Sequence, residues 1–577
     1  MMAMKRFSFL GFALCWAVAA SAQVHIHSID ELNRKAVATL NSHAGLTERS
    51  NLEPDFRTFV TLSDKELGQQ MLDYGRIKRL RDGRYLLFYQ PLKHGYHIYL
   101  SFSDDAIHWS RGVRIFEGYK FTNGDGEEDT MKYATADAVE LENGDILCFC
   151  IFHSDKHYAR HLDEFGLCMK RSTDGGKTWG EEKVLHRTVD WEPYPMQLES
   201  SGEILVFFTD SDWDWDPNSS GCSLLRSSDG GKTWTLQKQA ARQRRAKAVP
   251  RQRSVGTPRI PADSTRTVFT DQMPVVVVLN GTQTALGAYE TQMTEGPLTI
   301  SLSWGDASWP ETLTGEKTGP KDRRNQCIEG GAPYLMQFPS GETLLSYGYG
   351  EFGCRLGDET GRNLPERPEF KPFGDRPMRW GAVAKKDDHT ALAVATHTYK
   401  GAKVEKAHLL VTQMRLNHAV DALRVPIIVD GRNTDWEAVD DALFLGSETP
   451  AQCCFRFAHD GSRLYILAEC LDDGLRTGDG LTLLLGDGAD KTRYYPVYMD
   501  ASPRAVKTAP APGLKAAASV VRGTGYVAEL SVELSQLPLG EDGKLYFNAM
   551  LYKGDQCDTF TGVRPFQVER WIPITLK

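Results

Sequence analysis

The sequence prints nearly the same octet twice, as "STDGGKTW" at Ser172–Trp179 and as "SSDGGKTW" at Ser227–Trp234, with the two aspartates 55 residues apart. In an Asp-Gly-Gly turn the carboxylate accepts backbone N–H bonds while the glycines take positive φ. A degenerate copy, "SDDAIHW", gives Asp104 and Trp109 the same spacing of five residues as in the octets. We therefore expect the octet to be a structural turn of a repeating fold, with its tryptophan packed on a neighbouring unit.

A second pattern recurs six times: a short extended segment, a turn rich in Gly, Asp, Asn or Ser, and an apolar strand. The turns centre on Gly83, Gly144, Gly202, Gly281, Gly341 and Asp388, which are 61, 58, 79, 60 and 47 residues apart. This spacing suits one four-stranded blade for each turn. Because helical periodicity is almost absent, the pattern predicts an all-β chain with a six-bladed β-propeller over residues 60–418.

The two ends of the chain differ from this repeat. Residues 1–22, with Lys5, Arg6, an apolar run and small residues at Ala20 and Ala22, predict a signal peptide and a secreted or periplasmic protein. Residues 23–59 form an N-terminal segment. Residues 424–577 alternate in polarity between Asp-Gly turns, which predicts a β-sandwich module.

Composition excludes several classes of function. The net charge of -9 speaks against a nucleic-acid partner. No later apolar run reaches the roughly 18 residues that a membrane span needs. The cysteines contain no C-x-x-C pair, and His153, His157 and His161 would align only on a helix. The acidic loop from Asp210 to Asp216 lacks the glycine and distal glutamate of an EF-hand. We therefore expect no metal and no cofactor.

The chemistry should lie on the propeller face opposite the octets and hairpin turns, where innermost strands start and second strands end. The candidates at these positions are Arg76, Asp137, Glu192, Asp271, Glu329, Asp210, Glu290 and Tyr347, with Trp213 nearby to stack on a sugar ring. Converging carboxylates are typical of a glycosidase, in which one carboxyl group protonates the leaving oxygen and another attacks the anomeric carbon or activates water. Each of these residues can also be read as a solvated group at the rim.

Through these octets and hairpins, residues 60–415 resemble the propeller glycosidases of the sialidase superfamily, which carry Asp-box (BNR) repeats. The segment "GRIKRLRDGRYLLFY" is similar to the one that supplies the first arginine of the sialidase carboxylate-binding triad, which implies that role for Arg76. The second triad arginine is missing, because Thr209 stands at its position. Threonine cannot make the forked bonds that hold a sialic acid carboxylate.

The exo-acting α-L-arabinanases of the same fold match better, through "DWEPYPMQL", "LLRSSDGGKTW" and "TDQMPVVVVLNGTQTALGAYET". This resemblance implies a retaining mechanism in which Glu192 and Glu290 are the catalytic pair, about 5 to 5.5 Å apart. We assign Glu290 as nucleophile and Glu192 as acid/base, with the reverse order open. Tyr347 would tune the nucleophile, whereas in a sialidase it would be the nucleophile itself.

The C-terminal module resembles the family-nine carbohydrate-binding modules. The matching residues are Asp430, Gly431, Asp435, Trp436, Asp472, Asp473, Gly478, Asp479 and Gly480, most of which suit turns or the core. The module favours a polymeric or surface-attached glycan as partner. Three hypotheses follow: an exo-glycosidase acting on terminal arabinofuranosyl or related neutral sugars, an exo-α-sialidase that draws its arginines from Arg323, Arg324, Arg355 or Arg379, and a catalytically silent glycan-binding propeller.

Overall fold

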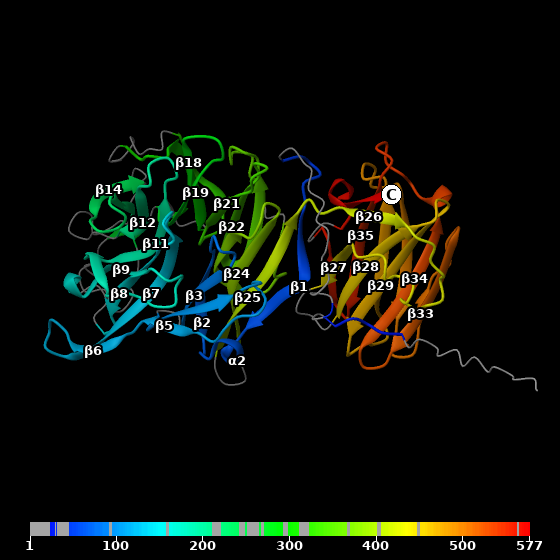
Figure 1. Ribbon diagram of the computed structural model, residues 1–577, viewed down its shortest axis with the longest axis horizontal. Coiled ribbons are helices and arrows are strands. Elements are labelled where there is room, and N and C mark those ends of the chain that lie inside the picture. The colour runs from blue at the N-terminus through cyan, green and yellow to red at the C-terminus, as the bar shows by residue number, and fades with distance from the viewer. Residues whose placement is uncertain are drawn as a thin grey trace, which may run out of the picture.

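The structure is a computed structural model that describes residues 24–28, 31, 46–91, 95–156, 161–210, 221–241, 249–250, 265–266, 271–291, 298–310, 322–365, 370–400, 405–446, 451–561 and 565–577. The expected signal peptide, Trp213, His157 and most of the acidic loop lie outside these residues. Figure 1 shows a β-propeller beside a β-sandwich, with strand β1 between them. Within the described residues, no helix is long and apolar enough to cross a membrane.

Blades I, III and IV are four-stranded antiparallel sheets and blade II is a five-stranded one; in each blade the innermost strand forms a hairpin with the second strand. Blade I consists of β2 (Leu72–Arg79), β3 (Tyr85–Pro91), β4 (Ile98–Ser103) and β5 (Val113–Phe116). Blade II consists of β7 (Glu128–Glu140), β8 (Ile146–Ser154), β9 (Phe165–Ser172) and β10 (Lys183–His186), with β6 (Tyr119–Thr122) added beside β7. Blade III consists of β11 (Asp190–Gln197), β12 (Ile204–Asp210), β13 (Gly221–Ser227) and β14 (Thr235–Ala241). Blade IV consists of β17 (Gln272–Val278), β18 (Thr284–Thr291), β19 (Thr299–Asp306) and β20 (Asp322–Glu329).

Blades V and VI share one six-stranded sheet. Blade V is built on β21 (Tyr334–Gln337) and the long β22 (Thr343–Gly357), and blade VI on β23 (Met378–Lys385), β24 (Thr390–Lys400), β25 (Glu405–Leu416) and β1 (Leu52–Leu62). The described chain thus has the six hairpins that the repeat predicts. β1 pairs with β25 and closes the ring, so the propeller takes in residues that we had placed in the N-terminal segment. Short elements are α2 (Asp64–Leu67), η1 (Leu162–Glu164), β15 (Val249–Pro250) and β16 (Thr265–Arg266).

The sandwich is confirmed as a second all-β unit. Its strands are β26 (Val420–Arg424), β27 (Ala442–Gly446), β28 (Ala451–His459), β29 (Arg463–Asp472), β30 (Asp479–Gly486), β31 (Tyr494–Ala501), β32 (Val506–Thr508), β33 (Leu514–Val521), β34 (Gly525–Glu533), β35 (Leu545–Lys553), β36 (Gln556–Thr559) and β37 (Ile572–Leu576), with η3 (Leu534–Gln536) and η4 (Val568–Arg570). Its core holds Phe455, Phe457 and Phe547. Trp436 is fully buried and its indole N–H donates to Glu529 at 2.8 Å, so this tryptophan braces the core and offers no surface to a sugar.

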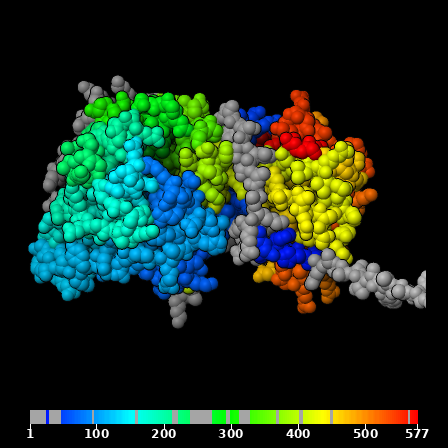
Figure 2. Space-filling model, viewed as in Figure 1, coloured from blue at the N-terminus to red at the C-terminus, as the bar shows by residue number. Residues whose placement is uncertain are grey.

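β1 also ties the two units together, because its outward side packs on the sandwich. Phe56 meets Phe444 edge to face with ring centroids 5.5 Å apart, and the Arg57 guanidinium lies 3.8 Å over the same ring. Beside them, His418 and Glu53 form a buried ion pair at 3.0 Å. In Figure 2 the darkest blue patch, from the described N-terminal residues, lies against the lower edge of the sandwich, while the lighter blue of blade I lies in the propeller.

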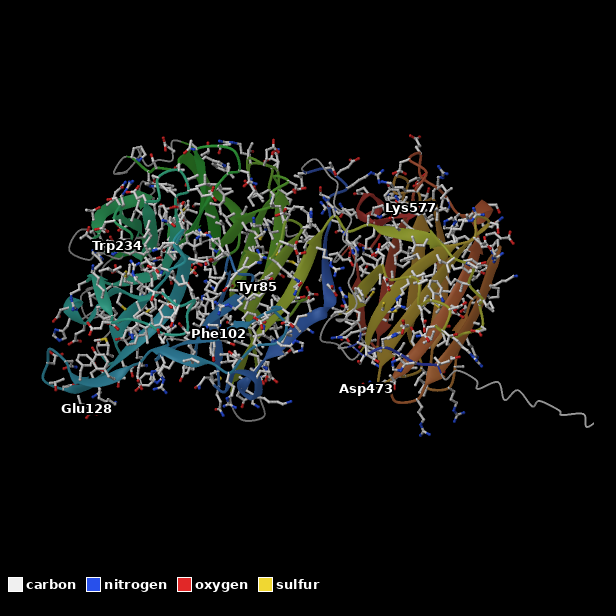
Figure 3. All side chains as sticks on the ribbon, viewed as in Figure 1. Tyr85, Phe102, Glu128, Trp234, Asp473 and Lys577 are labelled. Carbon is white, nitrogen blue, oxygen red and sulfur yellow. The ribbon has the colours of Figure 1, made fainter. Side chains whose placement is uncertain are left out.

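The octets are structural turns. Asp174 and Asp229 each accept a backbone N–H and a hydroxyl from the threonine four residues on, and both glycines of each octet have positive φ. Trp179 packs on Phe88 of blade I, and Trp234 packs on Phe149 of blade II. Figure 3 shows Trp234 on the side of the propeller away from Asp473 and Lys577 of the sandwich. The repeated tryptophans therefore pin each blade to the one before it.

Two details of these turns differ from the sequence prediction. In blade I the turn aspartate is Asp105 and not Asp104: Asp105 accepts the backbone N–H groups of Ile107 and His108, both at 2.8 Å, whereas Asp104 is exposed. Blade IV has an equivalent turn without the double glycine, in which Asp306 accepts the N–H of Ser308, and Trp309 packs on Phe207 of blade III. The sequence prediction takes Asp104 because it lies five residues before Trp109, as in the octets. The blade I turn is one residue shorter than the octets, so its turn aspartate is the next residue, Asp105.

The correction predicts unequal effects for two adjacent aspartates. Asp105→Ala leaves two turn N–H groups without their acceptor and should lower the free energy of unfolding by about 1–2 kcal/mol, whereas Asp104→Ala should change it by less than about 0.5 kcal/mol. Thermal and urea unfolding of both variants measures this. Equal losses, or a larger loss for Asp104→Ala, would contradict the assignment.

Candidate active site

A ring of strained residues surrounds the propeller axis on the face opposite the hairpin turns. Every blade has a non-glycine residue with φ between 47° and 55° near this end of its innermost strand: Tyr74, Thr135, Glu192, Met273, Ala332 and Trp380. Met71 and Asp271, which directly precede the innermost strands of blades I and IV, also lie in this range. Five of the six hairpins also show a register shift at this point. A bulge of this kind redirects a side chain, and a non-glycine residue at positive φ costs free energy that its surroundings must offset. Four of these side chains, those of Tyr74, Met273, Ala332 and Trp380, pack as one cluster.

Hydrogen bonds between blades hold the ring. At four junctions the backbone N–H of the bulge residue donates to a side chain at the end of the second strand of the preceding blade. The pairs are Thr135 to Gln90 at 2.7 Å, Met273 to Thr209 at 2.9 Å, Ala332 to Glu290 at 2.8 Å and Tyr74 to Thr396 at 3.1 Å. At the junction of blades II and III the N–H of Glu192 instead donates to the Thr135 hydroxyl at 3.4 Å.

Glu192 is the bulge residue of blade III. Its Oε2 accepts a hydrogen bond from the Thr209 hydroxyl at 2.7 Å, and part of its surface remains accessible to solvent. Burial raises the pKa of Glu192 to about 8; the negative charge of Glu290 adds to this rise, while Thr209 and Arg76 oppose it. Glu192 therefore holds its proton at neutral pH.

Glu290 ends the second strand of blade IV, opposite Gln272, and is partly accessible to solvent. Its Oε2 accepts the Ala332 N–H, and burial raises its pKa to about 7. A Cβ at Gly331 would lie 2.7 Å from Oε2 of Glu290. Glycine is thus required at position 331 for the carboxylate to reach the backbone of blade V.

The two carboxyl groups share a design. In each group Oε2 accepts a hydrogen bond. Among the described residues, Oε1 of neither group has a hydrogen-bond partner. The charge of Glu290 acts on Glu192, so the groups lie within electrostatic range across the junction of blades III and IV. Two buried carboxyl groups whose free oxygens can exchange protons suit general acid–base chemistry with a second carboxylate as nucleophile or base.

Arg76 lies beneath this pair and is enclosed by protein. Its guanidinium is stacked between the rings of Tyr74, at 3.9 Å, and Tyr334, at 5.3 Å. Nη1 donates to the carbonyls of Gly75 and Trp380, both at 2.9 Å, and the residue is only 4% exposed. Arg76 therefore supports the site and ties blade I to blade VI through Nη1.

Below Arg76 a polar cluster separates the site from the axial channel. Asp137 accepts from Lys78 at 2.7 Å and from the Tyr334 hydroxyl at 2.9 Å, and Lys78 also donates to that hydroxyl. A cavity of about 620 Å³ opens at the hairpin-turn face and ends at Lys78, Tyr194 and Tyr334. Asp137, which we expected among the substrate-binding groups, instead belongs to this buried cluster.

The remaining expected carboxylates form no described hydrogen bond with Glu192 or Glu290. Asp210 is buried against Ser223, whose hydroxyl donates to it at 2.6 Å, and Asp271 is fully buried with its N–H on the Thr291 hydroxyl. Glu329 is exposed at the end of β20, because the first strand of blade V begins only at Tyr334. Of the expected carboxylates, the structure brings together Glu192 and Glu290.

Tyr347 is buried between blades IV and V. Its hydroxyl donates to Glu351 at 3.0 Å, and the Arg355 guanidinium lies 5.1 Å from its ring centroid. The expectation that Tyr347 acts on the nucleophile is not supported by its contacts, because its partner is Glu351 and not Glu290. Glu351 in turn pairs with Lys371 at 2.8 Å.

Sequence reasoning missed Asp73 and gave Thr209 and Arg379 other roles: Thr209 only marked the missing second arginine, and Arg379 was one of four possible arginine sources in the sialidase alternative. Asp73 precedes the blade I bulge and pairs with Arg379 at 3.2 Å; burial raises its pKa to about 6 although Arg379 opposes the shift. Asp73 and Arg379 each directly precede a bulge residue, so an alignment of the six hairpins on their strand starts would have found them. No group of His, Cys, Asp and Glu that could hold a metal occurs among the described residues.

No family model and no curated protein matches the chain. Among solved structures, the NanB sialidase from Streptococcus pneumoniae is 12% identical, with 62% of this chain and 69% of that chain covered and a TM-score of 0.41. An endo-arabinase from Bacteroides thetaiotaomicron is 15% identical, with 52% and 97% covered and a TM-score of 0.33. A family-nine carbohydrate-binding module from Caldicellulosiruptor kristjanssonii, in complex with cellotriose, is 18% identical, with 28% and 93% covered and a TM-score of 0.23. At these values the neighbours say nothing about the substrate of this chain.

The raised pKa values predict a stability that falls as pH rises. An unfolded glutamate loses its proton near pH 4.5, whereas Glu290 and Glu192 lose theirs near pH 7 and pH 8 in the folded chain. Between these limits the unfolded state binds fewer protons, so the free energy of unfolding decreases, by about 3 kcal/mol for Glu290 alone. The double variant Glu192→Gln/Glu290→Gln should remove this decrease, as measured by urea unfolding at pH 5, 6.5 and 8.

The matched control is Glu329→Gln, which changes an exposed glutamate and should keep the wild-type pH dependence. Gln90 already fills the ring position of Glu290 in blade I, so glutamine at position 290 can still accept the Ala332 N–H. A double variant whose stability falls with pH as steeply as the wild type would contradict the raised pKa values.

Proposed function

We propose that the chain is a retaining exo-glycoside hydrolase that removes terminal neutral sugars from a glycan, with Glu192 as acid/base and Glu290 as nucleophile. The observation that carries this proposal is the pair of interacting carboxyl groups on the propeller face opposite the hairpin turns, each with one oxygen held by a donor and one that bonds none of the described residues.

The environments of the two groups assign the roles. The general acid must hold a proton at working pH and the nucleophile must be ionised. Glu192 holds its proton more strongly because the charge of Glu290 adds to burial, whereas Glu290 accepts a backbone N–H that favours its carboxylate. When Glu290 loses its proton, its negative charge raises the pKa of Glu192, so Glu192 stays protonated. The first step requires this combination of an ionised nucleophile and a protonated acid.

The contacts of Arg76 favour a neutral sugar. An acidic sugar such as sialic acid needs guanidinium groups with free, forked donors. Arg76 is buried and its Nη1 donates to two carbonyls, and Thr209 occupies the strand end where the resemblance places a second arginine. Arabinofuranosyl ends are the neutral class that the sequence resemblance implies.

One observation favours the sialidase alternative. A tyrosine activated by a glutamate is the nucleophile that the sialidase resemblance implies, and Tyr347 donates to Glu351 at 3.0 Å. Under that mechanism Tyr347→Phe abolishes turnover, whereas under our proposal it lowers turnover less than about 10-fold because, among the described residues, the Tyr347 hydroxyl bonds Glu351 and neither proposed catalytic glutamate.

For the rest of the chain we propose export through the signal peptide and attachment to a glycan surface through the sandwich. The module's Asp-Gly and Asp-Trp segment is held by Glu529, which accepts the backbone N–H groups of Asp430, Gly431 and Arg432. The backbone of this motif segment thus shapes the module.

The direct test uses linear arabino-oligosaccharide and a chromogenic sialoside as substrates. We expect release of terminal arabinose by the wild type, and a loss of about 10³-fold or more in kcat/KM for Glu192→Gln and for Glu290→Gln. Glu329→Gln should keep wild-type activity. Release from the sialoside, together with inactivity of Tyr347→Phe, would establish the alternative; folded glutamate variants with wild-type rates would refute the proposed pair; and binding without turnover would indicate a silent propeller.

A further inference from the structure

Thr209 stands where the two catalytic blades meet. Its hydroxyl oxygen accepts the Met273 N–H of blade IV at 2.9 Å, and its hydroxyl group donates to Oε2 of Glu192 at 2.7 Å. Thr209 is only 1% exposed, so protein groups must satisfy these bonds. From these contacts, and resting on the proposed function, we infer that Thr209 is a positioning residue that fixes Oε2 of Glu192 as an acceptor and leaves Oε1 as the oxygen that carries the catalytic proton.

The direction of the two Thr209 hydrogen bonds follows from which atoms carry a hydrogen. A hydroxyl has one hydrogen, and the backbone N–H of Met273 can only donate. Once the Thr209 oxygen accepts that N–H, the arrangement that satisfies the buried groups directs the hydroxyl hydrogen to Glu192. An oxygen that accepts this bond is a poor place for the acid proton, which therefore occupies the other oxygen.

The ring of bulges shows that this arrangement is more than a structural tie. Gln90, Thr209, Glu290 and Thr396 all accept the N–H of the next bulge. Of these, Thr209 also contacts a carboxyl group of the proposed pair, and Glu290 is itself a member. The equivalent strand-end position is therefore occupied by the proposed nucleophile, Glu290, in blade IV. In blade III it is occupied by Thr209, which supports the proposed acid Glu192.

Thr396 provides a matched comparison within the same chain. Its hydroxyl accepts the Tyr74 N–H at 3.1 Å and forms a hydrogen bond with Asp73 that lowers the pKa of Asp73. Thr396→Val and Thr209→Val therefore remove the same atoms from equivalent ring positions, but only Thr209→Val removes a bond to Glu192.

The charged and titratable groups that face Glu192 are Glu290 from blade IV, Arg76 from blade I and the hydroxyl of Tyr74, also from blade I. Glu290 raises the pKa of Glu192, and Arg76 and Thr209 lower it. Loss of the Thr209 bond removes one of the two groups that lower the pKa of Glu192 and leaves Glu290 and Arg76 in place. The pKa of Glu192 should therefore rise.

The experiment titrates the carboxyl groups by infrared spectroscopy and identifies the Glu192 band by its absence in Glu192→Gln. Thr209→Val should raise the pH midpoint of this band by about one unit and shift the basic limb of the kcat/KM profile by the same amount. Thr209→Ser should restore the wild-type midpoint, and Thr396→Val should leave it unchanged. If valine at position 209 prevents folding, Thr209→Ala removes the same hydroxyl with less bulk.

The outcomes separate the two proposals. An unchanged Glu192 midpoint in Thr209→Val or Thr209→Ala, or an equal shift in Thr396→Val, overturns the role of Thr209 even when the wild type hydrolyses glycans. If Thr209→Val shifts the Glu192 midpoint but the wild type hydrolyses no glycan, the role of Thr209 stands and the proposed activity is overturned.

Discussion

The hydrogen bond from a strained backbone N–H of one blade to a strand-end side chain of the blade before it is the interaction on which the site depends. In five of the six hairpins the innermost strand bulges at a residue with positive φ, and in blade V the residue with positive φ, Ala332, precedes the strand. Conformations of this kind persist only where neighbouring contacts hold them. Gln90, Thr209, Glu290 and Thr396 supply those contacts, so ring closure and site geometry are set by the same bonds.

On the opposite face, closure relies on a different kind of contact. There the turns carry tryptophans, and Trp179, Trp234 and Trp309 each pack edge to face on a phenylalanine of the preceding blade. Aromatic contacts tolerate variation in the turn, as Trp309 shows by keeping its place without the Asp-Gly-Gly sequence. Hydrophobic packing thus fixes the face that carries the turns, while the face that carries the bulges depends on hydrogen bonds of defined direction. Directed hydrogen bonds are what hold the carboxyl groups of Glu192 and Glu290 in place.

These two kinds of contact also decide what could be predicted from sequence. Glycine turns and Asp-Gly-Gly octets leave local patterns, so the six hairpins and the propeller could be predicted. β1 could not be placed, because its partner β25 lies some 350 residues away and pairing over that distance leaves no local mark. Glu192 and Glu290 were found through motif resemblance, but Asp137 and Asp210 occupy similar strand ends and face Lys78 and Ser223. A bulge reverses which way a side chain faces without changing the pattern of polarity.

The ring position at the second strand's end needs only one acceptor atom, and this explains how Glu290 can be both structural and reactive. Threonine and glutamine meet the requirement with their single side-chain oxygen. A carboxylate meets it with Oε2 and keeps Oε1 for chemistry, provided that the next blade leaves room, which Gly331 does. At Glu192 the roles divide differently, because the bulge turns the carboxyl group inward and the neighbouring Thr209 supplies the restraint. The asymmetry between the proposed acid, which is restrained by a hydroxyl, and the proposed nucleophile, which is restrained by a backbone N–H, therefore follows from which strand of its blade each glutamate occupies.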